Sequence, residues 1–235
     1  MNKIITLLTI GTVSVFAQIT PSELMTKVYG KYDSKAKCWH NKEYCMEIDS
    51  SKVLNCDTGK RLYLMATGDN DIGHIHVSSG SVGAFVVEEQ NGKDVIIAQN
   101  KNMEMGSYGQ APREWKLVKL APSDYWGWIN QDGYGNQGYY NSWYSILAPY
   151  GKTIKYLGEI MSNQSDSAVS GNPTIDLDSK FKIDDSNKNV KIYPLLITVS
   201  GINNGNNIKP IQYTINFDFN KWQYIVPSNY IIKGF

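Results

Sequence analysis

The sequence predicts an all-β protein, an antiparallel β-sandwich-like unit with one short helix near its N-terminus. Tyr, Trp, Asn and Gly are abundant while only 19% of the residues are charged, a composition typical of exported β-proteins with long turns. Apolar and polar residues alternate along several segments after residue 43, as they do in half-buried strands. Pairs of turn-forming residues separate these segments, which favours antiparallel hairpins over helices.

The first seventeen residues have the pattern of a cleaved export signal. Lys3 is followed by a mostly apolar stretch from Ile4 to Phe16, and Val15-Phe16-Ala17 suits a signal peptidase that cuts before Gln18. The stretch is too short to span a bilayer, which takes about 20 residues, and no second one follows. We therefore expect a signal peptide over 1–17 and a soluble exported chain, periplasmic or secreted, with no membrane insertion.

The charge distribution argues against a polyanionic partner. The formal net charge is +1, and the basic residues are scattered, with no lysine run and no arginine-rich segment. Proteins that bind nucleic acid or anionic membranes through charge usually cluster their basic residues. We therefore expect no nucleic acid, and no anionic membrane, as the main partner.

One helix is predicted directly after the cleavage point. Thr20 is a good N-cap, Pro21 suits the first helical position, and Glu23 completes a capping box. Apolar residues then recur on one side of the helix until Gly30, which ends it.

The three cysteines allow one disulfide in an exported protein. Residues 43–48 and 53–56 read as two strands around a four-residue turn. In that register Cys45 faces Cys56, and facing strand residues lie about 4.5–5.5 Å apart at Cα, within the reach of a disulfide. The sequence therefore predicts a Cys45–Cys56 disulfide with Cys38 free.

The strongest hairpin signal is Asn91-Gly92, the preferred pair for a type I′ turn. A two-residue loop there places Val87 opposite Ile96 and Val86 opposite Ile97. Because adjacent strand residues point to opposite faces, both faces of this hairpin are apolar. We expect a central element that is covered on both sides.

Further strands are predicted at residues 60–67, 195–199, 211–219 and 222–226. The polar segment 162–173 is either a link to a small C-terminal domain or a surface loop within one unit. A domain of that size without its own cysteines would be marginally stable. We favour a single β-rich unit over 18–235, with 162–173 as a possible sub-boundary.

His74 and His76 are candidate metal ligands, since residues two apart in a strand share a face. Asp69 and Asp71 lie just upstream, and His40 could join them to hold zinc or copper. The alternative is that both histidines are ordinary surface residues, because the apolar neighbours after each of them occupy the other face. No other cofactor is predicted.

The most unusual segment is Tyr125–Tyr150, where nine aromatic residues alternate with Gly, Asn, Gln and Asp. Aromatic faces stack on sugar rings and neighbouring amides bind hydroxyls, so this composition suits glycan recognition, and it also suits a protein interface. The alternative is that the tryptophans belong to the core. The predicted ligand-binding residues are Trp126, Trp128, Tyr134, Tyr139, Tyr140 and Trp143.

Three classes of function follow. The first is a non-catalytic exported protein that binds a glycan, a cell-envelope component or a protein through the aromatic segment. The second is a metal-dependent hydrolase centred on His74 and His76. The third is a periplasmic inhibitor or immunity-type protein that fills the cleft of another enzyme. No catalytic residue can be assigned, since no nucleophile elbow or selected pair of carboxylates is present.

Overall fold

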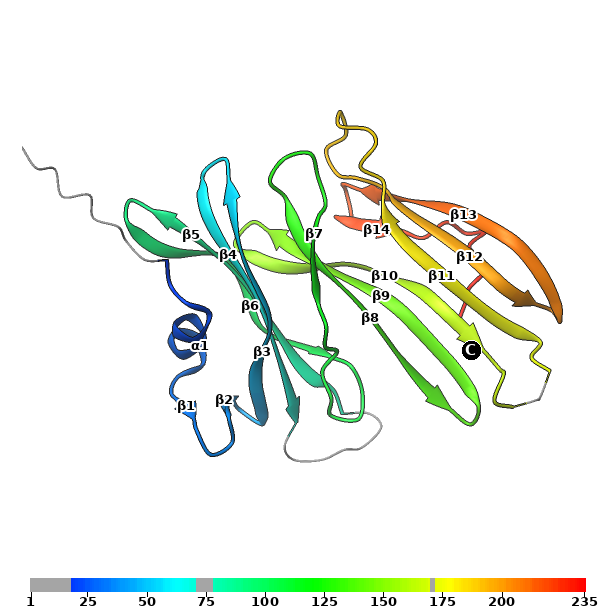
Figure 1. Ribbon diagram of the computed structural model, residues 1–235, viewed down its shortest axis with the longest axis horizontal. Helices are drawn as coiled ribbons and strands as arrows, with labels where there is room; N and C mark the ends of the chain where they lie inside the picture. Colours follow the sequence, from blue (N-terminus) through cyan, green and yellow to red (C-terminus); the bar gives the residue numbers. More distant parts are fainter. Residues whose placement is uncertain (1–17, 71–77, 170–171) are drawn as a thin grey trace, which may run out of the picture.

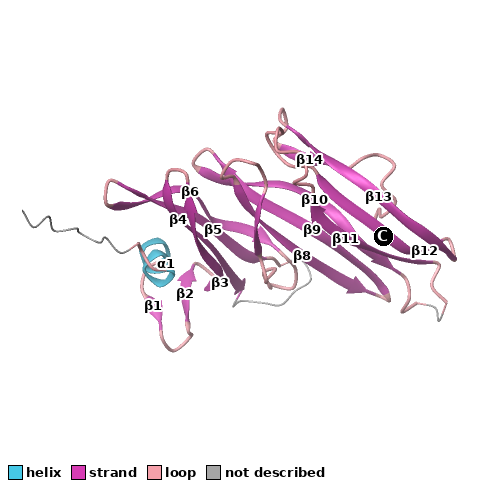
Figure 2. Cartoon of the chain, turned by 45° about the horizontal axis from the view of Figure 1, so that its top comes forward, coloured by secondary structure: helices cyan, strands magenta, loops and turns pink. Residues whose placement is uncertain are grey.

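The computed structural model describes residues 18–70, 78–169 and 172–235, and most of this part of the chain lies in strands. The predicted signal peptide 1–17 and the candidate metal ligands His74 and His76 lie outside the described residues. The all-β prediction is confirmed, with a single helix in the described part (Figure 2). The elements are α1 (Pro21–Tyr29), β1 (Tyr32–Asp33), β2 (Cys38–Asn41), β3 (Tyr44–Cys56), β4 (Gly59–Asn70), β5 (Gly80–Gln90), β6 (Lys93–Met105), β7 (Lys116–Lys119), β8 (Trp126–Asn136), β9 (Tyr139–Tyr150), β10 (Thr153–Ser165), β11 (Ile175–Ile183), β12 (Leu195–Asn203), β13 (Asn206–Asp218) and β14 (Gln223–Ile225).

The strands form one 14-stranded, hydrogen-bonded sheet. The main order is β1-β2-β3-β4-β5-β6-β10-β11-β12-β13-β14, and β9, β8 and β7 branch from β10. All paired strands are antiparallel except β6 and β10, which meet in parallel through one residue pair, Gln99 and Thr153. The sheet bends sharply at that junction, so its parts stack as successive layers along the long axis of the molecule (Figure 1).

Three apolar clusters fill the spaces between the layers. The first lies between α1 and one face of β2–β5, with Leu24 and Phe85 fully buried in it. The second lies between the opposite face of β4–β6 and the β8–β10 layer, where Met65 packs with Trp128. The third joins β8–β10 to β11–β14 and to the C-terminal segment, which buries Tyr230. The packing is therefore sandwich-like, although the sheet itself is continuous.

The N-terminal helix begins and ends as its sequence predicts. The Thr20 side chain accepts the backbone N–H of Glu23, and the Glu23 carboxylate accepts the backbone N–H of Thr20 at 2.8 Å, which completes the capping box. Gly30 ends the helix with φ 93°, a conformation that favours glycine.

The Asn91-Gly92 hairpin is confirmed, with φ of 53° and 73° at the two turn residues. Val87 faces Ile96 as predicted, but Val86 faces Ala98 because a β-bulge inserts Ile97 into β6. Val86 and Val87 are each 1% exposed, on opposite faces, so the hairpin is covered on both sides.

The predicted Cys45–Cys56 disulfide is wrong, because no turn interrupts residues 44–56. They form the single strand β3, whose two ends carry the two cysteines roughly 35 Å apart. Cys45 instead bonds Cys38, at a Cα separation of 5.5 Å, and Cys56 is the free cysteine. The polar run that resembles a turn is a solvent-facing part of β3, and the hairpin turn comes after Cys56.

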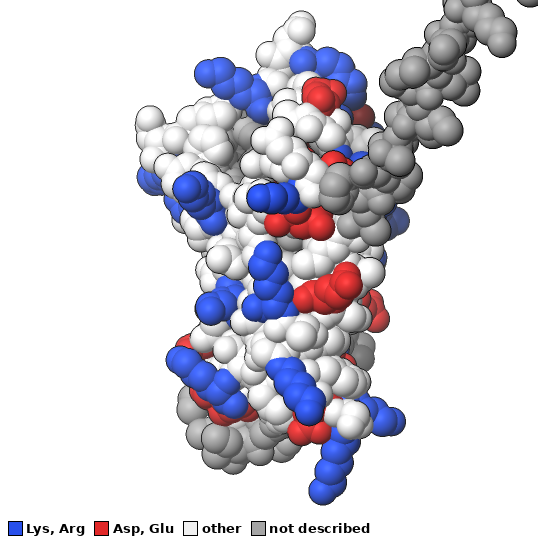
Figure 3. All heavy atoms as spheres, turned by 90° about the vertical axis from the view of Figure 1, so that its left-hand side faces the viewer, with Lys and Arg blue, Asp and Glu red and all other residues white. Residues whose placement is uncertain are grey.

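Charged side chains are dispersed over the surface near α1. On the face that Figure 3 shows, acidic side chains lie among the basic ones and no large area carries a single sign. Within the described residues, no helix has the length and apolar character needed to cross a membrane.

Candidate ligand-binding site

The aromatic segment forms the long hairpin β8–β9, and its residues divide between core and surface. Tyr134, Tyr139 and Tyr140, near the β8–β9 turn, are 42%, 41% and 44% exposed. Trp128 is 1% exposed and packs on Tyr63, with ring centroids 5.8 Å apart. Trp128 therefore belongs to the core between two layers, which is the alternative that the sequence leaves open for the tryptophans. The hairpin is covered near its base, where Trp128 lies, but not at its tip.

Of the two half-buried tryptophans of the hairpin, only Trp143 packs against one of its exposed rings. Trp143 packs edge-on against Tyr134, with centroids 6.1 Å apart. Trp126 lies at the other end of β8, where the Lys119 Nζ is 5.9 Å from its ring. Tyr139 packs edge-on against the C-terminal Phe235 at 4.7 Å. Neighbouring rings therefore restrict the orientations of Tyr134 and Tyr139.

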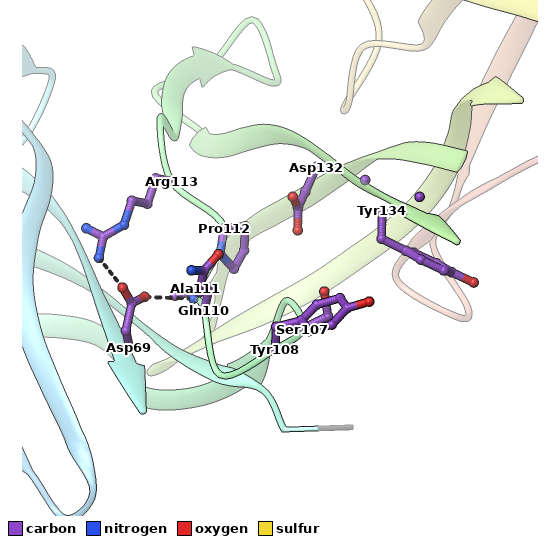
Figure 4. A pocket seen from close by; sticks show the side chains of 11 residues that line it. Asp69, Ser107, Tyr108, Gln110, Ala111, Pro112, Arg113, Asp132 and Tyr134 are labelled. Carbon is purple, nitrogen blue, oxygen red and sulfur yellow. Dashed lines mark hydrogen bonds and ion pairs between the residues drawn. The ribbon is translucent and has the colours of Figure 1, made fainter. Parts of the chain in front are cut away.

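One exposed tyrosine, Tyr134, lines a polar cleft between β8 and the loop that precedes β7. We call it the tyrosine cleft, and its volume is about 430 Å³. In Figure 4 the Asp132 carboxylate points into the space between the strand and the loop, and the Tyr108 and Tyr134 rings lie beside that space. The cleft is lined by Asp69, Ser107, Tyr108, Gln110, Ala111, Pro112, Arg113, Asp132, Gly133, Tyr134 and Gly135.

Two carboxylates from other strands fix the loop side of the cleft. Asp69, in β4, accepts the backbone N–H of Ala111 at 3.0 Å and the Arg113 guanidinium at 2.9 Å. Asp49, the residue at a β-bulge in β3, accepts the backbone N–H groups of Glu114 and Trp115 at 2.8 and 2.9 Å. The loop therefore has a defined conformation without a ligand, which lowers the entropy cost of binding.

The local sequence of the loop explains its tight turn. Tyr108 and Gly109 both have positive φ, 55° and 75°, and Ser107 pairs with Gln110 across the turn. Gly106 also has positive φ, and a Cβ at this position would lie 2.1 Å from the Gln110 carbonyl oxygen. A side chain at residue 106 would therefore displace the turn that presents Tyr108.

The strand side of the cleft is an unpaired edge of the sheet. β7 pairs with β8 only from Trp126 to Ile129, and among the described residues no strand pairs with that edge beyond Ile129. Gly133 and Gly135 line the cleft without side chains, so their backbone groups contribute directly to its surface. Such groups can exchange hydrogen bonds with a ligand.

The charged groups of the cleft differ in how well they are paired. Arg113 pairs with Asp69 at 2.9 Å and with Glu47 at 3.5 Å. Burial opposes the charge of Arg113, but the hydrogen bond and charge of Asp69 outweigh that effect and raise its pKa. Asp132 has no partner among the six ion pairs of the described residues. Burial raises the pKa of Asp132, and a hydrogen bond from the Gly133 backbone only partly offsets this. Asp132 is therefore the carboxylate with acceptor capacity left for a ligand.

Most of the site was not predictable from local sequence. Of the predicted ligand contacts only Tyr134 lines the cleft, while Tyr139 and Tyr140 lie at the hairpin tip outside it. The one local signal for the missed wall is the segment Gly106-Ser107-Tyr108-Gly109, two glycines around an aromatic residue in a turn.

A metal site is not found in the part of the chain that the structure describes. Its residues contain no group of three His, Cys, Asp or Glu side chains placed to hold a metal ion. His40 contacts Asp33, with Nε2 and Oδ2 3.3 Å apart, and Asp69 is engaged by Arg113. His40 and Asp69 therefore do not point to a common centre.

Comparisons with protein-family models, curated proteins and solved structures gave no match.

Proposed function

We propose that this chain is an exported, non-catalytic binding protein that recognises a glycan in the tyrosine cleft. The observation that carries the proposal is that Tyr108 and Tyr134 line one cleft together with Asp132, Gln110 and Arg113. Tyrosine rings stack on the C–H faces of sugars, and carboxylate, amide and guanidinium groups bind the hydroxyls.

The composition of the cleft favours a hydroxylated ligand over an apolar one. Its polar side chains come from three separate segments, around residues 69, 107–113 and 132. An apolar ligand would leave Asp132 and Gln110 desolvated without hydrogen-bond partners, at a cost of about 1–3 kcal/mol for each group. A sugar would supply hydroxyl donors and acceptors at the same time as a face for the tyrosines.

The same geometry favours binding over glycoside cleavage. Most glycosidases use two carboxylic groups on either side of the scissile bond. Here Asp69 is held by Arg113 and by the Ala111 backbone, which leaves Asp132 as the carboxylate without an ion pair in the cleft. One such group can orient a ligand.

Two observations support export as part of the proposal. The Cys38–Cys45 disulfide is consistent with an oxidising compartment. The first seventeen residues have the composition of a signal peptide. Removal of residues 1–17 during expression, detected as a new N-terminus at Gln18, would test this part.

The test of the cleft is a glycan array followed by calorimetry on the best ligand. We expect Tyr134→Ala to weaken binding by about tenfold or more, because stacked rings in a pocket contribute about 1–3 kcal/mol. The matched control is Tyr150→Ala, a tyrosine of the same hairpin with 47% exposure that lies outside the cleft. Thermal unfolding of each variant establishes that the fold is retained.

Two results would overturn the proposal. One is that no glycan binds to the folded wild-type chain. The other is that Tyr134→Ala binds as tightly as Tyr150→Ala.

The exposed Tyr139 and Tyr140 at the hairpin tip favour a protein partner as the second candidate. A protein captured by the wild type but not by the Tyr139→Ala/Tyr140→Ala double variant would support that second function.

A further inference from the structure

A second aromatic surface lies far from the tyrosine cleft, at the opposite end of β9. We call it the aromatic ridge, and it consists of Tyr150, Phe217, Phe219 and Trp222. The ring centroids of Tyr150 and Trp222 are 5.0 Å apart, those of Trp222 and Phe217 5.4 Å, and those of Phe217 and Phe219 5.1 Å. Four rings from β9, β13 and the turn after β13 therefore form one continuous row.

The ridge has an anchored inner part and an exposed outer part. Phe217 also packs on Tyr224, which is 4% exposed, and both belong to the apolar cluster of the C-terminal layers. Phe219 and Tyr150 are each 47% exposed. Phe219 follows the last residue of β13 and so begins the turn to β14. Contiguous exposed apolar rings of this kind mark an interaction surface.

Lysines stand at both ends of the ridge. The Lys155 Nζ lies 5.2 Å from the Tyr150 ring centroid and donates to the Lys221 carbonyl oxygen at 3.0 Å. The Lys191 Nζ lies 5.9 Å from the Phe219 ring centroid. None of these three lysines takes part in an ion pair among the described residues. The nearest acid in the turn, Asp218, accepts the backbone N–H groups of Asn220 and Lys221.

We propose that the aromatic ridge docks the protein onto an anionic phospholipid surface. Aromatic side chains are favoured at the boundary between lipid headgroups and hydrocarbon, where an apolar ring and a polar edge are both accommodated. Lysines around such rings extend their ammonium groups to lipid phosphates, and each contributes about 1 kcal/mol at an anionic surface. The exposed Phe219 would enter the headgroup region, with Lys155 and Lys191 on either side of it.

The position of the lysines favours lipid over a second sugar site. The Lys155 and Lys191 ammonium groups lie over the two exposed rings, whose faces a stacked sugar would need. Phe219 also lacks the hydroxyl with which tyrosine binds a sugar. On a membrane, however, the lysine ammonium groups can turn away from the rings to contact lipid phosphates, and the rings then face the lipid.

Folding explains why this surface is not visible in the sequence. Lys155, Lys191 and Lys221 lie at least thirty residues from one another along the chain, so they form no basic run. Lys155 lies in β10, Lys191 in the segment before β12, and Lys221 in the turn after β13. Folding brings these three segments to one row of rings. The contact is peripheral and involves no membrane-crossing element.

The experiment is cosedimentation of the full folded chain with vesicles of equal parts phosphatidylglycerol and phosphatidylcholine. Pure phosphatidylcholine vesicles give the neutral reference. We expect the wild type to bind the anionic vesicles, and we expect Phe219→Ser to reduce the partition coefficient about tenfold, because the variant loses the inserted ring. The Lys155→Gln/Lys191→Gln variant should reduce it by a similar factor and should remove most of its dependence on salt.

Two control variants separate this proposal from the others. Val53→Ser changes an apolar residue that is 51% exposed on a different layer, and it should bind vesicles like the wild type. Tyr134→Ala tests the tyrosine cleft and should also leave vesicle binding unchanged. Equal binding to neutral and anionic vesicles, or wild-type binding by Phe219→Ser, would overturn the proposal. So would sedimentation equilibrium that shows a dimer which Phe219→Ser dissociates, because a second copy would then cover the ridge.

Discussion

The Arg61 Nε lies 2.5 Å from Glu88 Oε2, in an ion pair that joins β4 to β5 and whose side chains are 18% and 9% exposed. Glu88 also accepts hydrogen bonds from Thr58 and Gln90, at 2.8 and 3.1 Å. Arg61 reaches across to the carbonyl oxygen of Asp124, in the segment before β8, at 3.4 Å. A single buried pair thus connects the N-terminal strands to the layer that carries the aromatic hairpin.

Removing one member of this pair should destabilise the fold strongly. We expect Glu88→Ala to lower the free energy of unfolding by about 3 kcal/mol, because it leaves a buried guanidinium without a counter-charge. The Arg61→Met/Glu88→Leu double variant should lose less than Glu88→Ala, since it leaves no unpaired charge. Urea denaturation of the three proteins measures the difference. A double variant less stable than Glu88→Ala would show that the pair itself contributes net stability.

Acid should weaken the fold through the same carboxylate. Burial alone would raise the pKa of Glu88, but the hydrogen bonds from Gln90, Arg61 and Thr58 outweigh it and hold the pKa below 4.5. Because the folded-state pKa is depressed, this stabilisation is complete above pH 4.5 and is lost as the pH falls through the folded-state pKa. Urea midpoints between pH 7 and pH 3 should therefore fall more steeply for wild type than for Glu88→Gln. Parallel curves for the two proteins would contradict the assignment.

Local chemistry explains which parts of the fold the sequence could predict. The Asn91-Gly92 turn and the capping box of α1 are correct because the groups that determine them lie within four residues of each other. The Cys45–Cys56 pairing fails because a polar stretch on an exposed strand has the same composition as a turn. Distinguishing the two requires the neighbouring strand, which pairs Ser50 with Met65 and is not visible locally.

The candidate site shows the same limit more strongly. The wall of the tyrosine cleft is held by hydrogen bonds that Asp49 and Asp69 accept from backbone N–H groups 65 and 42 residues away. Aromatic density points to the β8–β9 hairpin, but it does not separate the buried Trp128 from the exposed Tyr134. Only the stacking of layers decides that one ring is covered and the other is open.

Cys38 and Cys56 exchange the roles that the sequence predicts for them, while Cys45 stays disulfide-bonded. Cys38→Ser and Cys45→Ser should each lower the free energy of unfolding by about 2–3 kcal/mol, the value expected for a disulfide that closes a loop of this length. Cys56→Ser should change it little, because the Cys56 thiol is free and only half-buried. Peptide mapping without reduction should find Cys38 joined to Cys45. A bridge to Cys56 would contradict the structure.

The aromatic hairpin should separate into core and surface under alanine substitution. Trp128→Ala should destabilise the chain by about 3–5 kcal/mol, because it removes the largest fully buried side chain between two layers. Tyr140→Ala should cost less than about 1 kcal/mol, since Tyr140 is 44% exposed. Thermal unfolding distinguishes the two, and similar melting temperatures would show that Trp128 is not in the core.

Ligand binding in the tyrosine cleft should depend on pH through Asp132. Burial raises the pKa of this carboxyl above 3.8, and Asp132 has no cationic partner among the ion pairs of the described residues. If the carboxylate accepts hydroxyl groups of a glycan, the ligand stabilises the charged form, so affinity is full at neutral pH. It then falls as the pH drops through the raised pKa.

Calorimetry with the selected glycan from pH 7.5 to pH 4 measures this dependence. Asp132→Asn should bind more weakly at neutral pH and should show little change with pH, because its amide does not titrate. Asp69 and Arg113 also face the cleft, where they form an ion pair with each other. An Asp132→Asn variant that retains the pH profile of the wild type would assign the dependence to another group and remove Asp132 from the site.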